Sequence, residues 1–219
     1  MTGESSETTR LLRRAAQGDQ QAWGALLTQS RDRLRRVVAL RLDRRLQGRV
    51  DPSDIIQEAC IDASERLAEY VRQPDMPFFL WLRFLTGQRL LRVHRQHLGA
   101  EMRDVGREVS LYRGALPEAT SAALAAQLLG RDTRPSEAAI RAERRIRLQE
   151  ALNSMDPLDR EVLALRHFEH LTNGEAARVL GLQEPAAAKR YVRALKRLRQ
   201  ILDAKPGGLG GLYTARGPR

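Results

Sequence analysis

The stretch TNGEAARVLGLQEPAAAKRYVRALKRLR, from Thr172 to Arg199, constrains the fold of this chain more than any other. Thr172, with Glu175 three residues later, provides a capping box at the start of a short helix. Gly181 suits the left-handed residue that ends that helix, and Pro185 fits the first turn of a second one. The stretch therefore predicts a helix-turn-helix, whose second helix can enter a DNA major groove.

The second of these helices is amphipathic and strongly basic. Its apolar residues recur at spacings of three and four, as one face of a helix requires: Ala188, Tyr191, Leu195, Leu198 and Leu202. Six cations lie mostly off that face: Lys189, Arg190, Arg193, Lys196, Arg197 and Arg199. A solvated face of a helical bundle would also account for the charge. The cap and the turn, which specify geometry as well as charge, favour DNA binding.

Composition supports a helical protein with a polyanionic partner. The chain has 219 residues and a formal net charge of +11, which favours nucleic acid first and an acidic membrane surface second. Strand-like alternation is almost absent, and aromatic residues make up only 5% of the chain, so we expect an all-α fold with two small cores. No signal peptide or membrane span is expected, and the single cysteine, Cys60, fits a reducing cytoplasm.

Helical periodicity and breaker residues predict the domain organisation. We expect an N-terminal domain over 1–98 and a linker over 99–135 that contains a helix-prone run, Glu118 to Leu129. A C-terminal domain follows over 136–204, and a Gly-rich basic tail over 205–219 is expected to be disordered. Within the first domain, a long helix capped by Asp19 is expected to run to Gly48, and apolar spacing continues in it as far as Leu46.

An acidic cluster opens the next helix, DPSDIIQEACIDASERLAEYV, in an otherwise basic chain. Asp51 can cap this helix and Pro52 can open it. Capping and the helix dipole explain Asp51 and Asp54, but they do not explain Gln57 beside Glu58. These four polar residues therefore predict a docking face for a protein partner, with simple capping as the alternative.

The segment FFLWLRFLTGQRLLRVHRQHLG mixes aromatic rings with arginines. Such a mixture is typical of sites for single-stranded nucleic acid, where each base stacked on a ring contributes about 1–3 kcal/mol and cations hold phosphates. The candidate residues are Phe78, Trp81, Arg83, Gln88, Arg89, Arg92 and Arg95. An ordinary place in the core is the alternative for Phe78 and Trp81.

Taken together, these stretches resemble the two-domain sigma factors of the extracytoplasmic-function (ECF) group of bacterial RNA polymerase. DPSDIIQEA resembles the acidic D-x-x-Q-[ED] helix that docks on the clamp helices of core RNA polymerase. FFLWLRFLTGQRLLRVHR resembles the segment that melts and reads the −10 promoter element, and the stretch from Met155 to Arg199 resembles the domain that reads the −35 element. The resemblance covers about residues 9–98 and 137–203 and implies promoter-specific transcription initiation.

The resemblance also implies roles for individual residues. It places Asp51, Asp54, Gln57 and Glu58 on the polymerase-docking face. It assigns melted −10 DNA to Phe78, Trp81, Arg83, Gln88, Arg89, Arg92 and Arg95, where Gln88 and Arg92 depart from an Asn and an Asp common in the family. It assigns −35 duplex DNA to Glu184, Pro185, Ala187, Lys189, Arg190, Arg193 and Arg197. The linker would thread toward the active cleft, and an anti-sigma factor is a further partner, although no residue here identifies one.

Two other classes of function are weaker explanations of the sequence. A free-standing helix-turn-helix regulator would bind duplex DNA as a dimer, but it leaves the acidic cluster and the aromatic-arginine segment unexplained. A metalloenzyme would need more ligands than the pairs His94–His97 and His167–His170 provide. We therefore expect no enzyme, no cofactor and no metal, and a cytoplasmic, nucleoid-associated protein.

Overall fold

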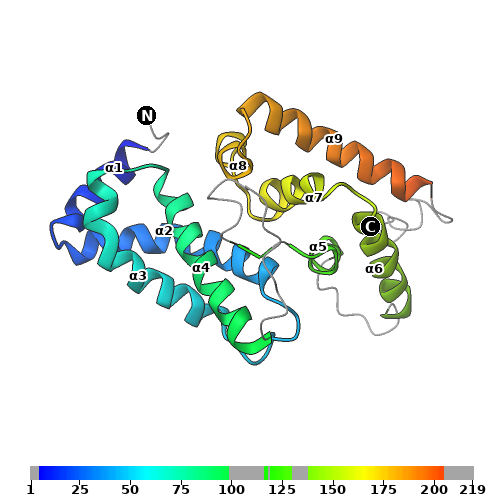
Figure 1. The fold of residues 1–219 in the computed structure, drawn as a ribbon, viewed down its shortest axis with the longest axis horizontal. Coiled ribbons are helices and arrows are strands. Elements are labelled where there is room, and N and C mark those ends of the chain that lie inside the picture. Colours follow the sequence, from blue (N-terminus) through cyan, green and yellow to red (C-terminus); the bar gives the residue numbers. More distant parts are fainter. Residues whose placement is uncertain (1–4, 99–115, 118, 130–137, 205–219) are drawn as a thin grey trace, which may run out of the picture. The chain divides into compact units, whose positions relative to one another are not determined.

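The computed structural model describes residues 5–98, 116–117, 119–129 and 138–204, without the side chains of Ala138, Ala139 and Arg141. This part of the chain is helical and contains no β-strand, which confirms the predicted all-α class (Figure 1). The chain divides into two compact units, Met1–Pro117 and Glu118–Arg219, which are described separately below. The helices of the first unit are α1 (Ser6–Ala16), α2 (Gln20–Arg41), α3 (Pro52–Arg72) and α4 (Phe78–Leu98). Those of the second are α5 (Ser121–Leu128), α6 (Ala138–Asn153), α7 (Pro157–Leu163), the π-helix η2 (Ala164–Phe168), α8 (Asn173–Leu180) and α9 (Glu184–Asp203).

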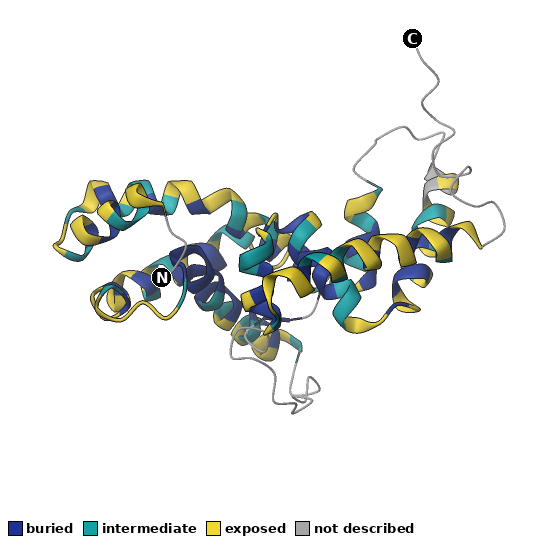
Figure 2. Cartoon of the chain, turned by 90° about the horizontal axis from the view of Figure 1, so that it is seen from above, coloured by how far each residue is buried: buried dark blue, intermediate teal, exposed yellow. Residues whose placement is uncertain are grey.

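Local capping chemistry sets the helix starts of the first unit. The side chains of Ser5, Asp19 and Asp51 accept hydrogen bonds from the first backbone N–H groups of α1, α2 and α3, which lack partners within the helix. Helix α1 therefore begins at Ser6. The four helices bury one face each in a shared core (Figure 2), whose largest fully buried side chains are Leu26, Leu34, Leu40, Leu46, Ile55, Leu82, Leu85 and Leu90.

The predicted length of the second helix was wrong. Helix α2 ends at Arg41, because Leu42 leaves the helical region with φ −68° and ψ 123°. The backbone N–H of Asp43 then donates to His94 Nε2 at 3.2 Å instead of continuing the helix. Leu46 is buried all the same, so apolar spacing persisted in the sequence after the helix had ended.

Two tertiary contacts hold other segments of the first unit. The guanidinium of Arg33 lies over the ring of Phe79, 3.5 Å from its centroid, so α2 and α4 share a cation–π contact. Arg41 is buried and donates from Nη1 to the carbonyl oxygen of Pro117 at 2.8 Å. This hydrogen bond ties the last residue of the unit to the end of α2.

The second unit is built around the helix pair α8–α9. Helices α6, α7 and α8 each contact α9, and α5 contacts α6. Asp156 caps α7, and Pro157 opens it. The chain then passes through η2 and reaches His170 in the left-handed region, with φ 55°. The largest fully buried side chains of this unit are Leu124, Leu152, Leu165 and Leu171, whereas Ile146 is 58% exposed.

Parts of the predicted organisation lie outside the described residues. These are most of the linker over 99–135 and the tail over 205–219. The helix-prone run in that linker contains α5, where Leu124 and Ala125 are fully buried. Across the described residues, no helix has the length and apolar character needed to cross a membrane.

Candidate polymerase and nucleic-acid interfaces

The turn between α8 and α9 has the geometry predicted for a helix-turn-helix. The N–H of Glu175 donates to Thr172 Oγ1 at 3.1 Å, and the N–H of Thr172 donates to Glu175 Oε2 at 2.8 Å, which completes the capping box. Gly181 ends α8 with φ 66°, and the N–H of Leu182 donates back to the carbonyl oxygen of Ala177 at 2.8 Å. These bonds fix the direction in which the chain enters α9.

Helix α9 presents most of its cations to solvent. Its buried face consists of Ala187, Ala194, Leu198 and Leu202. Of the residues predicted to contact −35 DNA, those with exposed side chains are Glu184, Pro185, Lys189, Arg193 and Arg197. The predicted contact of Ala187 with DNA does not fit the structure. Ala187 is 2% exposed because it packs inside the unit, and its methyl group is not available to a base. Leu195, predicted to face the core, is 40% exposed.

An open groove of about 490 Å³ borders the basic face of α9. One wall is basic and carries Arg193, Lys196 and Arg197; the other, at the start of α7, carries Ser154, Met155, Asp156 and Asp159. The two walls therefore bring opposite charges close together within the second unit.

Arg190 lies against two of those carboxylates. Its Nη2 is 2.9 Å from Asp156 Oδ1 and its Nε is 2.8 Å from Asp159 Oδ1. Asp156 also accepts the backbone N–H groups of Leu158 and Asp159 as the cap of α7. Although burial opposes it, these hydrogen bonds and Arg190 hold the pKa of Asp156 below its ordinary value. The sequence gave no signal for the pairing of Asp156 with α9.

The acidic start of α3 forms a continuous exposed face. Asp51, Asp54, Gln57 and Glu58 all have exposed side chains. Asp51 also caps the helix, since its Oδ1 accepts the N–H of Ser53 at 2.7 Å. Capping and exposure thus coexist at Asp51, and Asp54 and Gln57 carry exposed polar groups that can meet a partner's surface.

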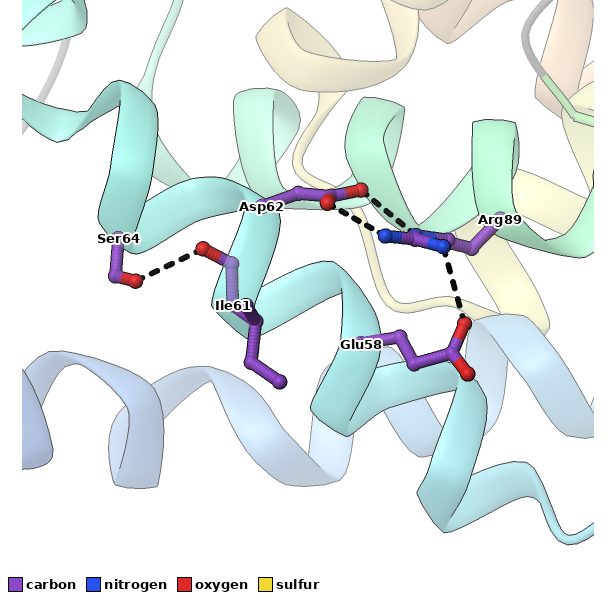
Figure 3. A network of polar contacts seen from close by, with 5 residues as sticks. All are labelled: Glu58, Ile61, Asp62, Ser64 and Arg89. Atoms are coloured by element: carbon purple, nitrogen blue, oxygen red, sulfur yellow. Dashed lines mark hydrogen bonds and ion pairs between the residues drawn. The ribbon is translucent and has the colours of Figure 1, made fainter.

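Glu58 is also part of an ion-pair network that links α3 to α4 (Figure 3). Arg89 Nε lies 2.7 Å from Asp62 Oδ2, its Nη2 lies 2.6 Å from Asp62 Oδ1, and its Nη1 lies 3.2 Å from Glu58 Oε2. The hydrogen bonds from Arg89 lower the pKa of Asp62, and Asp62 in turn raises the pKa of Arg89. Asp62 was missed in the sequence, although its place one helical turn after Glu58 is a usable signal.

The aromatic residues of α4 form a buried cluster with rings of α2 and α3. Trp81 stacks on Tyr70 with ring centroids 4.4 Å apart and planes at 16°, and Phe78 meets Trp23 edge-on at 6.2 Å. Phe78 is 2% exposed and Trp81 is 9% exposed. The base-stacking role predicted for these two residues does not fit this burial, because neither ring has a face open to a base.

The remaining α4 residues of the predicted −10 set divide by exposure. Gln88, Arg92 and Arg95 are exposed and recur at helical spacing along one side of α4. Arg83 is 2% exposed and lies in the core, so its predicted contact with DNA does not fit either. Arg89 is held by Asp62 and Glu58, so α4 offers an exposed polar stripe without the aromatic platform predicted beside it.

Comparison with known proteins places these features in context. A family model described as Sigma-70, region 4 matches residues 145–198, which contain α7, α8 and most of α9. The chain is 30% identical to the RNA polymerase sigma factor NccH of Alcaligenes xylosoxydans xylosoxydans, over 89% of this chain and 94% of the relative. It is 26% identical to the ECF RNA polymerase sigma factor SigD of Mycobacterium tuberculosis, over 93% and 88% of the two chains.

A solved structure shows a similar fold. CnrH, in complex with the cytosolic domain of CnrY, matches with a TM-score of 0.52 and 24% identity, over 91% of this chain and 99% of CnrH. At this level of identity the likeness concerns the fold alone, and it spans both units of the chain.

Proposed function

Since the chain belongs to the ECF group of bacterial RNA polymerase sigma factors, we propose that its two units carry separate parts of promoter recognition. As a sigma factor, it binds core RNA polymerase and promoter DNA and directs transcription initiation. The assignment of each step to particular residues is our proposal. The observation that carries it is the α8–α9 helix-turn-helix, whose second helix exposes a row of cations.

The exposed face of α9 binds duplex DNA at the −35 element. Lys189, Arg193 and Arg197 follow one another at a spacing of four, so their charges lie along one side of the helix. Each contact between such a cation and a phosphate adds about 0.9 to the slope of log affinity against log salt. Glu184 and Pro185 lie at the exposed start of α9, the end that approaches base edges in docked helix-turn-helix proteins.

The exposed stripe of α4 binds the opened strand at the −10 element. Gln88 supplies an amide that can hydrogen-bond to a base edge, and Arg92 and Arg95 supply charge for phosphates. Because Phe78 and Trp81 are buried, base capture on this surface relies on hydrogen bonds and charge. The aromatic cluster supports it indirectly by fixing the start of α4 against α3.

The acidic face of α3 docks on core polymerase. Asp54, Gln57 and Glu58 are exposed on a helix of a chain with net charge +11, so this face is a local reversal of sign. Charge of this kind sets orientation and association rate at an interface, through complementarity with a basic partner surface. Docking is what holds the two DNA-binding units at a fixed spacing on one promoter.

The same proposal covers the roles of the two units, the location of the protein in the cell and a further protein partner. The −10 activity belongs to the first unit and the −35 activity to the second. The protein acts in the cytoplasm at the nucleoid and performs no catalysis itself, because phosphodiester chemistry belongs to core polymerase. The solved structure of CnrH contains the cytosolic domain of CnrY, and an anti-sigma factor is a further partner for this chain.

Start-site mapping tests the proposal. Core polymerase is incubated with genomic DNA with and without the full chain, and the 5′ ends of the transcripts are sequenced. New start sites that share upstream sequence at two fixed positions are expected with the chain. The Asp54→Ala/Gln57→Ala variant should lose them, and Asp32→Ala, an exposed carboxylate on α2, serves as the matched control. Transcripts unchanged by the chain would refute the proposal.

A further inference from the structure

The contact between Arg190 and the start of α7 gives this arginine a role different from that of its neighbours on α9. Its Nη2 donates a hydrogen bond to Asp156 Oδ1 at 2.9 Å, and its Nε lies within ion-pair distance of Asp159 Oδ1, at 2.8 Å. The side chain of Arg190 is 32% exposed, and its neighbours Lys189 and Arg193 are exposed residues. Within the described residues, no ion pair is seen for Lys189 or Arg193.

The carboxylates that hold Arg190 are themselves fixed in place. Asp156 Oδ1 accepts the N–H of Leu158 at 2.8 Å and that of Asp159 at 3.3 Å, so the cap of α7 and the anchor of Arg190 are one atom. Any rotation of α9 about its axis would pull Arg190 away from a group that the α7 backbone holds still. The contact therefore limits the rotation of α9 relative to α7.

Rotation of α9 matters because its DNA-facing residues lie on one side only. In a helix each residue turns by 100°, so Lys189 and Arg193 lie 40° apart and point in nearly the same direction. A recognition helix that is rotated by a fraction of a turn presents different side chains to the groove. Holding the register of α9 therefore holds the set of residues that reach the bases.

We propose that Arg190 is a positioning residue, which clamps α9 to Asp156 and Asp159 so that Lys189 and Arg193 face the −35 duplex. This rests on the proposed function and changes one part of it, because the resemblance assigned Arg190 to DNA. In this role Arg190 affects DNA binding through its contact with α7, and it does not itself contact a phosphate or a base.

A salt series distinguishes the two roles. Polymerase holoenzyme assembled with the full chain is titrated on a promoter found by start-site mapping, at several salt concentrations. Arg193→Ala, a direct contact in the proposal, should lower the salt slope by about 0.9. Arg190→Ala should weaken binding by about threefold to tenfold and leave the slope at the wild-type value. A fall of about 0.9 for Arg190→Ala would show a phosphate contact and overturn the inference. A fall worth several contacts would show that the unit has unfolded, and would overturn it as well.

Hydrogen exchange provides a second readout that does not require DNA. Arg190→Ala and Asp156→Asn/Asp159→Asn should each speed amide exchange in α9, where Asn at 156 retains an oxygen that can cap α7. When all three changes are combined, exchange should be no faster than in Arg190→Ala alone, because the clamp has already been lost. Additive effects would contradict the clamp.

The two tests separate failure of the inference from failure of the proposed function. If start-site mapping finds no promoter, the proposed function fails, while hydrogen exchange still tests the contact. If Arg193→Ala lowers the salt slope as expected and Arg190→Ala lowers it by the same amount, only the inference fails.

Discussion

Arg89 on α4 grips both oxygens of Asp62 on α3, with nitrogen–oxygen distances of 2.7 and 2.6 Å, although the two residues lie 27 positions apart in the chain. Both side chains are less than one fifth exposed. A two-point contact of this kind is geometrically specific and stronger than an ordinary surface ion pair. It joins the helix of the proposed docking face to the helix of the proposed −10 face. In each unit, then, one arginine assigned to DNA by resemblance is occupied by carboxylates of the protein itself.

Removing this contact should destabilise the first unit. Arg89→Ala leaves Asp62 with a largely buried charge that has lost its main partner, so we expect a loss of about 1–3 kcal/mol in the free energy of unfolding. Urea denaturation of the full chain measures it. Arg92→Ala, on the same helix but exposed, should change stability by less than about 0.5 kcal/mol. Equal effects of the two variants would mean that the Arg89 contact contributes little.

Trp81 should behave as a core residue. It is 9% exposed and stacked on Tyr70, so Trp81→Ala should cost about 3–5 kcal/mol of stability, measured by urea denaturation. Trp81→Phe should retain most of that stability, and Arg95→Ala provides an exposed control on α4. A Trp81→Ala chain of normal stability that fails to open a promoter would instead support the stacking role that the sequence suggested.

Gly181 should resist substitution more than a glycine within a helix. Its φ of 66° lies in the left-handed region, so Gly181→Ala should destabilise the second unit by roughly 1–2 kcal/mol and loosen the helix-turn-helix. Gly24, within α2, has open space where a Cβ would lie, so Gly24→Ala should stabilise the chain by about 0.5–1 kcal/mol. Thermal unfolding of both variants compares them, and shifts of the same sign would contradict the assigned turn geometry.

His94 should make stability depend on pH. It is 3% exposed, its Nε2 accepts the N–H of Asp43, and burial lowers the pKa of His94 below 6.5, with Asp43 opposing and Arg45 adding to the shift. The unfolded chain therefore binds the proton more readily than the folded one. Stability contributed by neutral His94 is present above pH 6.5 and is lost as the pH falls toward the lowered pKa.

Urea denaturation over this pH range measures the effect. The loss of stability at low pH should be smaller in His94→Gln. The glutamine amide oxygen can accept the same N–H, but the side chain does not titrate in this pH range. His97→Gln, on an exposed position of the same helix, should retain the wild-type pH dependence. A loss of the same size in all three chains would assign the pH dependence to other groups.

Local chemistry made the helix-turn-helix predictable. Thr172, Glu175 and Gly181 act on backbone groups within a few residues, so their types and spacing were enough to specify both the cap and the turn. The end of α2 could not be found in this way, because the backbone N–H of Asp43, just after the helix, pairs with His94, 51 residues beyond Asp43. Apolar spacing alone continued to Leu46 and predicted too long a helix.

The difference between local and long-range interactions also explains for which candidate site residues the exposure was predicted correctly. Exposure of the α3 acidic face follows from helical periodicity, which the sequence displays. The burial of Phe78 and Trp81 depends on Tyr70 and Trp23, which come from other helices. Arg190 and its carboxylates lie up to 34 residues apart, and no local pattern distinguishes this arginine from the exposed cations beside it.

The central claim is that this chain binds promoter DNA as part of polymerase. Fluorescence anisotropy of a labelled promoter fragment, titrated with the chain in the presence and absence of core RNA polymerase, tests it most directly. The account predicts tight binding only when core polymerase is present, and loss of that binding in the Asp54→Ala/Gln57→Ala variant. Equally tight binding by the chain alone, unaffected by core polymerase, would contradict the account.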